Sequence, residues 1–224
     1  MSTYKYETHL HTDETSPCGK VPADEAVRIY HNAGYTGIIV TDHYFNGFFE
    51  IHPFTNWDKK INLFLAGYNK ALLEGQKLGL DVLLGMEIRL NENANDYLIY
   101  GISAEFLREY KKLYMLSLKA FRELTVGKGI IIIQAHPFRP YMVPAPPSLI
   151  DGVETYNGNP RHNSSNHLAM QYARDNGLKI LSGSDFHQRQ DAARGGIITG
   201  ERIKLDGFVD VIKQDRILDY IQTV

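Results

Sequence analysis

Residues 37–43 read Gly-Ile-Ile-Val-Thr-Asp-His, a short β-branched run that ends in an acid and a histidine. Such a run is too short for a helix and is typical of a buried strand. The same order, an apolar run followed by polar residues, occurs on both sides of it along the chain. We expect strands over residues 6–10, 37–41, 81–85, 97–100, 129–134, 152–156 and 178–182.

Helical patterns lie between most of these strands. In the first of them, Ala23, Ala26, Val27 and Tyr30 belong to an apolar stripe, and Gly34 provides a stop. We expect helices from near residue 22 and over 56–77, 104–126 and 162–176, loops over 44–54 and 140–147, and a closing strand over 208–212 before a short C-terminal helix.

Strand-then-helix alternation predicts an α/β protein whose parallel sheet is covered by helices. About seven strand–helix units fit a TIM-like barrel better than an open sheet. The length of 224 residues predicts a single domain over residues 1–224.

Composition excludes several classes of protein. Lys and Arg number 24 against 26 Asp and Glu, so the net charge of −2 offers no basic field and makes a nucleic-acid partner unlikely. The single cysteine rules out a disulfide within the chain and favours a reducing, cytoplasmic location. We find no apolar stretch long enough to span a membrane and no secretion signal at the N-terminus.

Histidines and acids follow the predicted strands where each strand ends. They are His9 and His11, Asp42 and His43, Glu87, His136, and Asp185 with His187. In a parallel barrel these ends converge on one rim, where active sites are built. Imidazoles together with carboxylates suit Zn, Mn or Fe(II), whereas Mg and Ca prefer oxygen ligands alone. There are more such groups than one ion can use, so we expect two or three divalent ions.

A single buried histidine is more often a hydrogen-bonded core residue than a ligand. We interpret the remaining histidines in this way: His31, His52, His162 and His167. Chance rarely places titratable groups at consecutive apolar strand ends, so the joint pattern predicts a metal site.

The same residues lie in motifs that resemble those of the PHP (polymerase and histidinol phosphatase) family. The motifs are His9-Leu-His11-Thr, Thr41-Asp-His43, Gly85-Met-Glu87, Ala135-His136-Pro and Gly183-Ser-Asp185-Phe-His187. The resemblance covers residues 6–187 and implies a distorted (β/α)7 barrel that hydrolyses phosphoesters at a di- or trinuclear metal site. It also implies that His9, His11, Glu87 and Asp185 hold one ion, Glu87 and His136 a second, and His43 and His187 a third.

Two positions depart from the family pattern. Members often carry a further metal ligand shortly after the first motif, where this chain offers Cys18 or Glu14. They also often carry a histidine on the fourth strand, where Asp96 is the candidate replacement. A thiolate would be a soft ligand for Zn, although a lone cysteine is usually an inert small apolar residue.

Phosphate contacts and proton transfer need further residues. Arginine suits bidentate phosphate binding, and Arg139 lies three residues after His136, with Arg161 and Arg194 as weaker candidates. The protonation step falls to His187 or to a metal-bound water. Residues 44–49, rich in aromatic side chains, either stack on a substrate ring or pack as a loop over the barrel mouth.

The sequence therefore predicts a phosphatase. A metal-activated hydroxide would hydrolyse a small phosphate monoester, with L-histidinol phosphate or a nucleotide-like molecule as candidate substrates. The alternatives are a phosphodiesterase or 3′–5′ nuclease, a non-catalytic metal-binding module, and an amidohydrolase. The oligomeric state does not follow from the sequence.

Overall fold

All strands of the chain join one mixed sheet in the order β10-β9-β1-β2-β4-β5-β6-β7-β8, with β3 paired to β4. The computed structural model describes residues 2–51, 53–204 and 207–223. The strands are β1 (Tyr4–Leu10), β2 (Gly37–Val40), β3 (His43–Tyr44), β4 (Asp81–Arg89), β5 (Asp96–Tyr100), β6 (Ile131–Gln134), β7 (Gly152–Asn157), β8 (Lys179–Gly183), β9 (Gly195–Thr199) and β10 (Ile217–Gln222).

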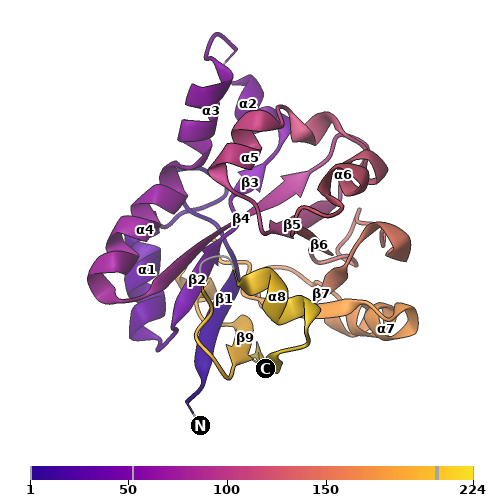
Figure 1. Ribbon diagram of the computed structural model, residues 1–224. Coiled ribbons are helices and arrows are strands. Elements are labelled where there is room, and N and C mark those ends of the chain that lie inside the picture. Colours follow the sequence, from indigo (N-terminus) through magenta and orange to yellow (C-terminus); the bar gives the residue numbers. More distant parts are fainter. Residues whose placement is uncertain (1, 52, 205–206, 224) are drawn as a thin grey trace.

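The sheet curls until its two ends approach each other, which makes a nearly closed barrel (Figure 1). Beyond the end of β8, Phe186 and β1 exchange backbone hydrogen bonds: His11 N donates to Phe186 O and Phe186 N donates to His9 O. The Thr8 hydroxyl also donates to Ser182 O of β8, at 2.6 Å. The expected α/β, distorted TIM-like barrel is confirmed.

The expected all-parallel sheet is wrong around β5 and also at β9, which is antiparallel to β1 and β10. Strands β1, β2 and β4 run parallel, as do β6, β7 and β8, but β5 is antiparallel to both of its neighbours. A short turn over residues 90–95 joins β4 to β5, and such a turn can connect only antiparallel strands. The amino end of β5, with Asp96 opposite Arg89, therefore lies at the edge where β4 ends.

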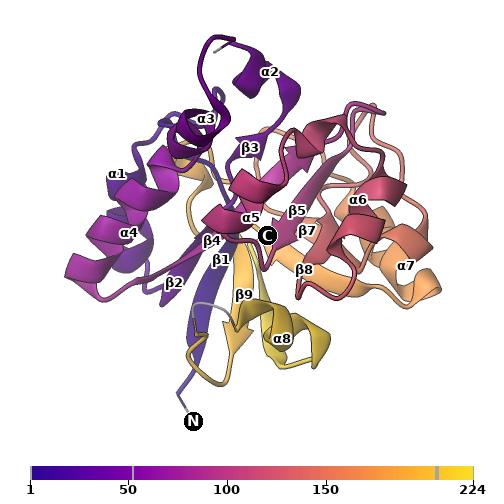
Figure 2. The same ribbon diagram turned by 45° about the horizontal axis from the view of Figure 1, so that its top comes forward.

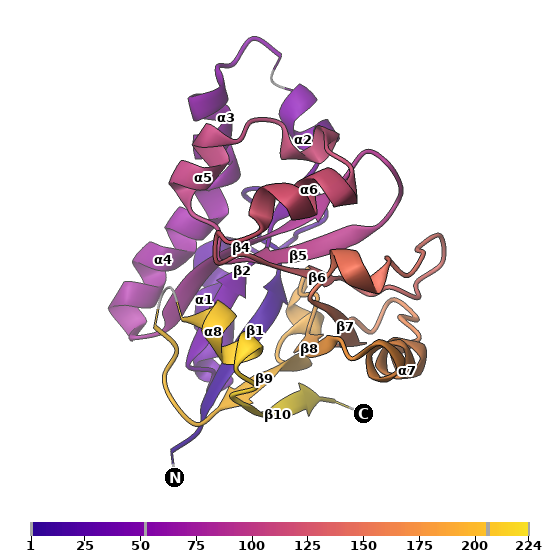
Figure 3. The same cartoon turned by 45° about the vertical axis from the view of Figure 1, so that its right-hand side comes forward.

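The helices cover the outside of the sheet, with one exception. They are α1 (Ala23–Asn32), α2 (Asn46–Glu50), α3 (Trp57–Phe64), α4 (Ala66–Leu78), α5 (Ala104–Glu109), α6 (Leu118–Thr125), α7 (Asn166–Asn176) and α8 (Phe208–Lys213). Helix α8 instead packs against the side chains of the barrel interior. Helices α1 and α4 pack side by side, and α2 and α3 project beyond β3 (Figure 2). Helix α7 packs against β7, and β10 pairs with β9 near the C-terminus (Figure 3). Within the described ranges, no helix combines the length and apolar character needed to cross a membrane.

Several expected boundaries are wrong because local signals interrupt the apolar pattern. The helix expected over 56–77 breaks at Leu65 into α3 and α4. The helix expected over 104–126 is divided into α5 and α6 by a turn in which Lys112 has a φ of 53°. Helix α6 begins after Ser117, whose side chain accepts a hydrogen bond from Ala120 N. Helix α7 starts at Asn166 rather than His162. The segment 44–54 contains the end of β3 and all of α2.

The C-terminal prediction is reversed. Residues 208–213 are the helix α8, while the final strand is β10, and β9 is a further strand that the sequence did not predict. Phe208, Val211 and Ile212 of α8 are buried against side chains from most of the sheet, including Tyr6 and Leu98. A short run of apolar residues does not by itself distinguish a strand from a helix.

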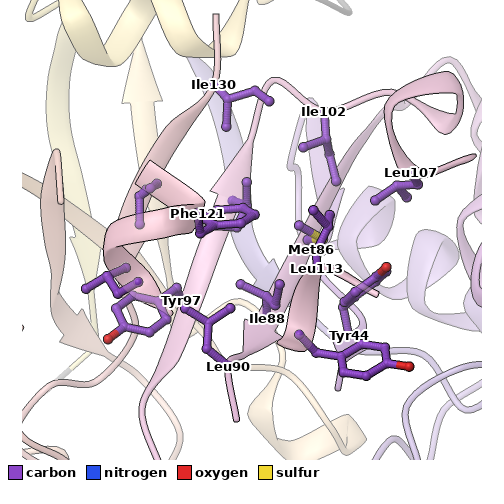
Figure 4. Close-up of a cluster of buried hydrophobic side chains, with 14 of the residues drawn as sticks. Tyr44, Met86, Ile88, Leu90, Tyr97, Ile102, Leu107, Leu113, Phe121 and Ile130 are labelled. Atoms are coloured by element: carbon purple, nitrogen blue, oxygen red, sulfur yellow. The ribbon is translucent and has the colours of Figure 1, made fainter. Parts of the chain in front are cut away.

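The largest apolar cluster lies between the sheet and the helices of the chain's middle part (Figure 4). Met86 and Ile88 of β4 and Tyr97 of β5 meet Phe121 of α6 and Tyr44 of β3 there, all essentially inaccessible to solvent. Strand β4 is buried over most of its length, and its buried positions carry apolar residues with the exception of Glu87.

A bulge in β1 decides where its histidines point. Glu7 pairs with Ile38 and Leu10 with Val40, so β1 has one residue more than β2 over this interval. The buried Glu7 carboxylate accepts hydrogen bonds from the N–H groups of Thr8 and His9, both at 2.9 Å. Glu7 thus satisfies the amides that the bulge leaves unpaired.

Candidate metal centre

Two imidazoles face each other at the end of β1. His9 Nε2 and His11 Nε2 lie 3.0 Å apart, and both rings are fully buried. The other ring nitrogen of His9, Nδ1, donates to the buried carboxylate of Glu154 on β7, at 2.8 Å. This bond leaves the Nε2 lone pair of His9 available to a cation, as is usual for a metal-binding histidine.

The Glu87 carboxylate lies at the centre of the imidazole cluster. Its Oε1 is 3.2 Å from His136 Nε2 and 3.3 Å from His9 Nε2. Its Oε2 is 2.8 Å from His43 Nδ1 and 3.5 Å from His11 Nε2. One carboxylate thus lies beside four imidazoles from three segments of the chain.

Asp185 is the second buried carboxylate of the cluster. Its Oδ1 lies 3.3 Å from His9 Nε2 and 3.4 Å from His11 Nε2. Its Oδ2 accepts a 2.6 Å hydrogen bond from Arg139, and its backbone oxygen accepts from His187 Nδ1 at 2.8 Å. Asp185 and His136 both have left-handed backbones, with φ of 51° and 29°. Strained conformations of this kind persist only where the surrounding structure holds them, and they concentrate at functional sites.

The donors form four overlapping sets of three, and within each set the donor atoms lie within 4.8 Å of one another. The sets are His11, His43, His187; His9, His136, Asp185; His9, His11, Glu87; and His43, Glu87, Asp96. All the strand-end histidines and acids that the sequence singled out, except Asp42, therefore come together in one place, and they come from distant parts of the chain.

Unsatisfied atoms in the cluster fit a bound cation. His136 Nδ1 and Glu87 Oε2 are buried and have no partner of hydrogen-bond geometry among the described residues. Buried polar groups without partners are costly and rare, so they need an explanation. Nitrogen and carboxylate donors that converge with unused lone pairs suit divalent ions such as Zn, Mn or Fe(II).

The charges of the cluster depend on one another. Burial opposes ionisation of Glu87, yet His43 and His9 hold the pKa of that carboxyl well below its usual range. Burial likewise opposes ionisation of Asp185, and His9 and Arg139 hold its pKa low. Burial, together with the neighbouring His43 and His187, holds the pKa of His11 well below its ordinary value. The acids are thus ionised and His11 is neutral, as metal binding requires. Despite burial, however, Asp185, Glu154 and Glu87 raise the pKa of His9, and Glu87 raises the pKa of His43. These two rings must therefore release a proton when an ion binds.

Asp42 follows β2 but serves the loop after β1 instead of the imidazole cluster. Its carboxylate accepts from Thr12 N at 2.7 Å and from the hydroxyls of Thr12 and Ser16 at 2.7 and 2.6 Å. Burial raises the pKa of Asp42 to about 6. Ser16 Oγ in turn accepts from His43 N at 3.0 Å and lies 3.3 Å from His11 Nδ1. Asp42 therefore fixes the loop that flanks two of the predicted ligands.

The three replacement candidates lie in different places. Asp96 is buried beside His43 and Glu87, and two hydrogen bonds from Arg89, at 2.8 and 2.6 Å, hold its carboxylate. Cys18 is exposed at the cavity that His43 lines. Glu14 is outside the four donor sets of the described residues; it accepts from Ala23 N at 3.0 Å and from Lys70 at 2.6 Å.

Contacts with His187 and His43 change the acidity of Cys18. Partial burial disfavours the thiolate, but the two histidines outweigh this effect and lower the pKa of Cys18 to about 6. Like Glu14, however, Cys18 belongs to none of the four donor sets of the described residues.

The arginines make internal ion pairs. Arg139 is largely buried and donates to Asp185, Asn157 and Ser164. Arg161 binds the buried carboxylate of Asp191, at 2.5 and 2.6 Å. Arg194 donates to Gly158 O at 3.1 Å. Arg139 therefore contacts a predicted metal ligand directly, while Arg161 supports a neighbouring loop.

Of the remaining histidines, His31, His162 and His167 are outside the four donor sets. His31 lies on α1, His167 on α7 and His162 before α7, and all three are exposed, so the expectation that they are buried core residues is wrong. His52 lies outside the described residues.

Sequence reasoning missed several buried polar residues that position the ligands. Glu154 accepts from His9 Nδ1, from His136 N at 3.1 Å and from Asn157 Nδ2 at 2.8 Å. Asp191 accepts from His187 N at 3.0 Å. The position of Glu154 in the middle of the predicted strand 152–156 could have indicated this role, because a buried carboxylate needs hydrogen-bond partners.

Glycine at position 183 lets β8 approach this site closely. A Cβ at Gly183 would lie 2.5 Å from His9 Cβ and 2.9 Å from Glu154 Oε1. Only a residue without a side chain leaves the contact between His9 and Glu154 intact.

Solved structures share this fold. A two-domain protein from Bacteroides vulgatus that contains a predicted PHP-like metal-dependent phosphoesterase is 19% identical with a TM-score of 0.65; the match covers 96% of this chain but only 64% of that one. A protein from Bifidobacterium adolescentis, provisionally named a metal-dependent phosphoesterase, is 18% identical with a TM-score of 0.56, and the match covers 96% of both chains. An amidohydrolase from Chromobacterium violaceum, solved with bound sulfate, is 15% identical with a TM-score of 0.55, and the match covers 81% of this chain and 87% of that one.

At these identities the structural likeness shows the fold alone. No curated protein is a significant match to the sequence. The sequence profile of the PHP domain matches residues 7–193, a range that includes every member of the four donor sets. The chain therefore belongs to the PHP domain family.

Proposed function

We propose that this protein is a metal-dependent phosphatase that hydrolyses a small phosphate monoester with two or three divalent ions. The observation that carries the proposal is the central position of Glu87, whose two oxygens face four imidazoles from three segments. Two ions bridged by one carboxylate are a common arrangement for hydrolysis of phosphate esters.

The donor sets indicate which residues would hold the ions. His9, His11, Glu87 and Asp185 surround the first position, and His136 joins Glu87 at the second. His43 and His187, together with His11, surround the third. When bound, such ions activate water at neutral pH and neutralise the charge that develops on the phosphoryl oxygens. Zn, Mn and Fe(II) fit these donors.

His187 is the proposed proton donor to the leaving oxygen when the third position is empty; with an ion on its Nε2, His187 is a ligand and has no proton to give there. Its Nδ1–H donates to Asp185 O, so the ring is oriented and Nε2 is left for the site. Its side chain is 12% exposed, which places it where the cluster meets solvent. Arg139 supports this arrangement by holding Asp185, and Arg161 does so by holding Asp191, which binds the backbone of His187.

The surroundings of the site favour a small substrate. A cavity of about 220 Å³ opens beside it and is lined by Pro17, Cys18, His43, Phe45, Arg89 and Asp96. The net charge of −2 disfavours a long polyanion, whose binding depends on many Lys and Arg contacts. We therefore expect a phosphorylated metabolite, such as L-histidinol phosphate or a nucleotide-like monoester, in the cytoplasm. A nucleic-acid or membrane partner is not expected.

The test combines metal analysis with a screen for phosphate release. The purified protein, loaded separately with Zn, Mn or Fe(II), is given monoesters, diesters, short oligonucleotides and simple amides. We expect orthophosphate from monoesters. Preference for diesters or oligonucleotides would establish the phosphodiesterase or nuclease alternative, and amide cleavage would establish an amidohydrolase. Metal binding without turnover of any substrate would favour the alternative that the protein is a non-catalytic metal-binding module.

Variants connect the activity to the cluster. Glu87→Gln and Asp185→Asn should fold yet lose metal and phosphate release together. Exposed acids far from the cluster provide matched controls, namely Glu123→Gln on α6 and Asp210→Asn on α8, which should keep both properties. Unchanged turnover of p-nitrophenyl phosphate in Glu87→Gln and Asp185→Asn would refute the assignment.

A further inference from the structure

The cavity beside the metal-binding cluster has room for a small part of a substrate. Its volume is about 220 Å³, and two of its lining residues, His43 and Asp96, belong to the donor sets. It is smaller than the pockets of about 300–1,000 Å³ that hold drug-sized ligands. A phosphate ester that reaches the cluster through this cavity would leave its alcohol there, so the alcohol must be small.

Arg89 brings a permanent positive charge to this cavity. It lies two residues after Glu87 on β4, so the two side chains are on the same face of the strand. Asp96 of β5 is directly opposite Arg89 in the strand register, and its carboxylate accepts hydrogen bonds from Arg89 Nε and Nη2, at 2.8 and 2.6 Å. These bonds fix the guanidinium and leave its Nη1 group for a ligand.

The cation of this pair reaches solvent, whereas the acid does not. The side chain of Arg89 is 46% exposed and that of Asp96 is 3% exposed. Asp96 is turned instead toward His43 and Glu87, with which it forms a donor set. A ligand in the cavity therefore meets the guanidinium, whose planar group of N–H donors matches a carboxylate or a phosphate.

Apolar side chains supply another part of the cavity wall. The ring of Phe45 lies 6.2 Å from the ring of His43, centroid to centroid, at an angle of 80°, and Pro17 also lines the cavity. A short carbon chain can pack against these two side chains while a charged group at its end reaches Arg89.

We propose that Arg89 selects phosphate monoesters whose alcohol carries a second anionic group, a carboxylate or a further phosphate. The inference rests on the proposed function and narrows its substrate class. In this role Arg89 contacts the alcohol and not the phosphoryl group that is hydrolysed. L-Histidinol phosphate has a positively charged amino group on its alcohol, so we expect it to be a poor substrate.

Binding of phosphonates tests this selection without any turnover, because their carbon–phosphorus bond replaces the ester bond. The zinc-loaded full chain is titrated in a calorimeter with 3-phosphonopropionate, propane-1,3-diphosphonate, propylphosphonate and 3-aminopropylphosphonate, and its zinc content is measured before and after. We expect at least one of the first two compounds to bind at least about tenfold more tightly than the last two, the contribution of one charge-assisted hydrogen bond. Comparison of the first two distinguishes a carboxylate from a second phosphate.

Variants assign the preference to Arg89. Arg89→Ala should lose it while the affinity for propylphosphonate and the zinc content stay unchanged, and Arg89→Lys, which keeps the charge, should retain part of it. Arg28→Ala is the matched control: Arg28 is also 46% exposed and pairs with two acids, Asp24 and Glu74, but lies on α1. It should behave as the wild type.

Two outcomes would overturn the role of Arg89. One is equal binding of all four phosphonates by the wild type. The other is an Arg89→Ala variant that binds every phosphonate more weakly by the same factor and loses zinc, because Arg89 would then act only by holding Asp96.

The same measurements separate this inference from the proposed function. A protein that releases phosphate from monoesters but has no preference for anionic phosphonates refutes the role of Arg89 alone. A protein that shows the preference but releases phosphate from no monoester retains the anion-binding role of Arg89 and refutes the proposed function.

Discussion

Replacing Arg139 with alanine should weaken metal binding, although Arg139 is not itself a ligand. In the wild type its guanidinium donates to Asp185 Oδ2 at 2.6 Å, and the side chains of Arg139 and Asp185 are 12% and 2% exposed. Removing one partner of a buried ion pair costs about 3–5 kcal/mol, because the other charge is left uncompensated. A bound divalent ion would compensate Asp185 in part, so the metal-free protein should show the larger loss of stability.

The effect on the metal follows from the lost orientation of Asp185. Residues that hold a metal ligand in place typically contribute about 10–100-fold to affinity, and we expect a loss of this size in Arg139→Ala. Competition with a zinc-binding dye measures the affinity, and elemental analysis measures the content after dialysis. Arg139→Lys keeps the charge but cannot hold Asp185, Asn157 and Ser164 together, so its loss should be intermediate.

Arg122 provides the matched control for this prediction. It makes two 2.8 Å hydrogen bonds to Asp151, in a more exposed pair between α6 and the start of β7. Arg122→Ala should lower stability with no change in zinc affinity. If Arg139→Ala instead kept its full metal content and showed only a higher KM, Arg139 would be a substrate-binding residue, and the reasoning from Asp185 would be refuted.

Two further predictions concern residues around the cluster. Glu154→Ala should lower zinc affinity about 10–100-fold, because His9 Nδ1 loses its acceptor; zinc titration checks this, and unchanged affinity would contradict the role of Glu154. The pKa of Asp42 is about 6 in the folded protein and about 3.9 in the unfolded chain. Proton binding to Asp42 therefore stabilises the folded state, fully below about pH 4, and this stabilisation is lost as the pH rises through about 6. In metal-free protein, Asp42→Asn should remove about 3 kcal/mol of that pH dependence in denaturant unfolding, and identical pH profiles of the two proteins would exclude the shift.

The clustering of the candidate ligands was largely predictable because it depends on local pattern. His9, His43, Glu87, His136 and Asp185 each follow or end a short apolar run, and a residue at the end of a strand lies at the same edge of the sheet in any parallel barrel. Chemistry of the side chains then indicated a transition metal. Their convergence around Glu87 agrees with that reasoning.

The secondary structure was less predictable where packing outweighed local pattern. The apolar run at residues 208–213 is consistent with either a strand or a helix, and burial of Phe208 and Val211 against the barrel interior decides for the helix. The turn at 90–95 is too short to contain a helix, so β5 is antiparallel to β4. Asp96, at the start of β5, therefore lies beside His43 and Glu87.

The sequence by itself determined the kind of protein: a barrel whose strand ends carry histidines and acids that could bind metal, because apolar periodicity and residue chemistry are properties of short segments. Only the tertiary structure decided which partners hold those residues. Glu154 lies 145 residues from His9, and Arg139 lies 46 residues from Asp185, yet both pairs are in hydrogen-bond contact. Such contacts depend on how distant segments pack. The bulge at Glu7 and the direction of β5 likewise depend on pairing with neighbouring strands.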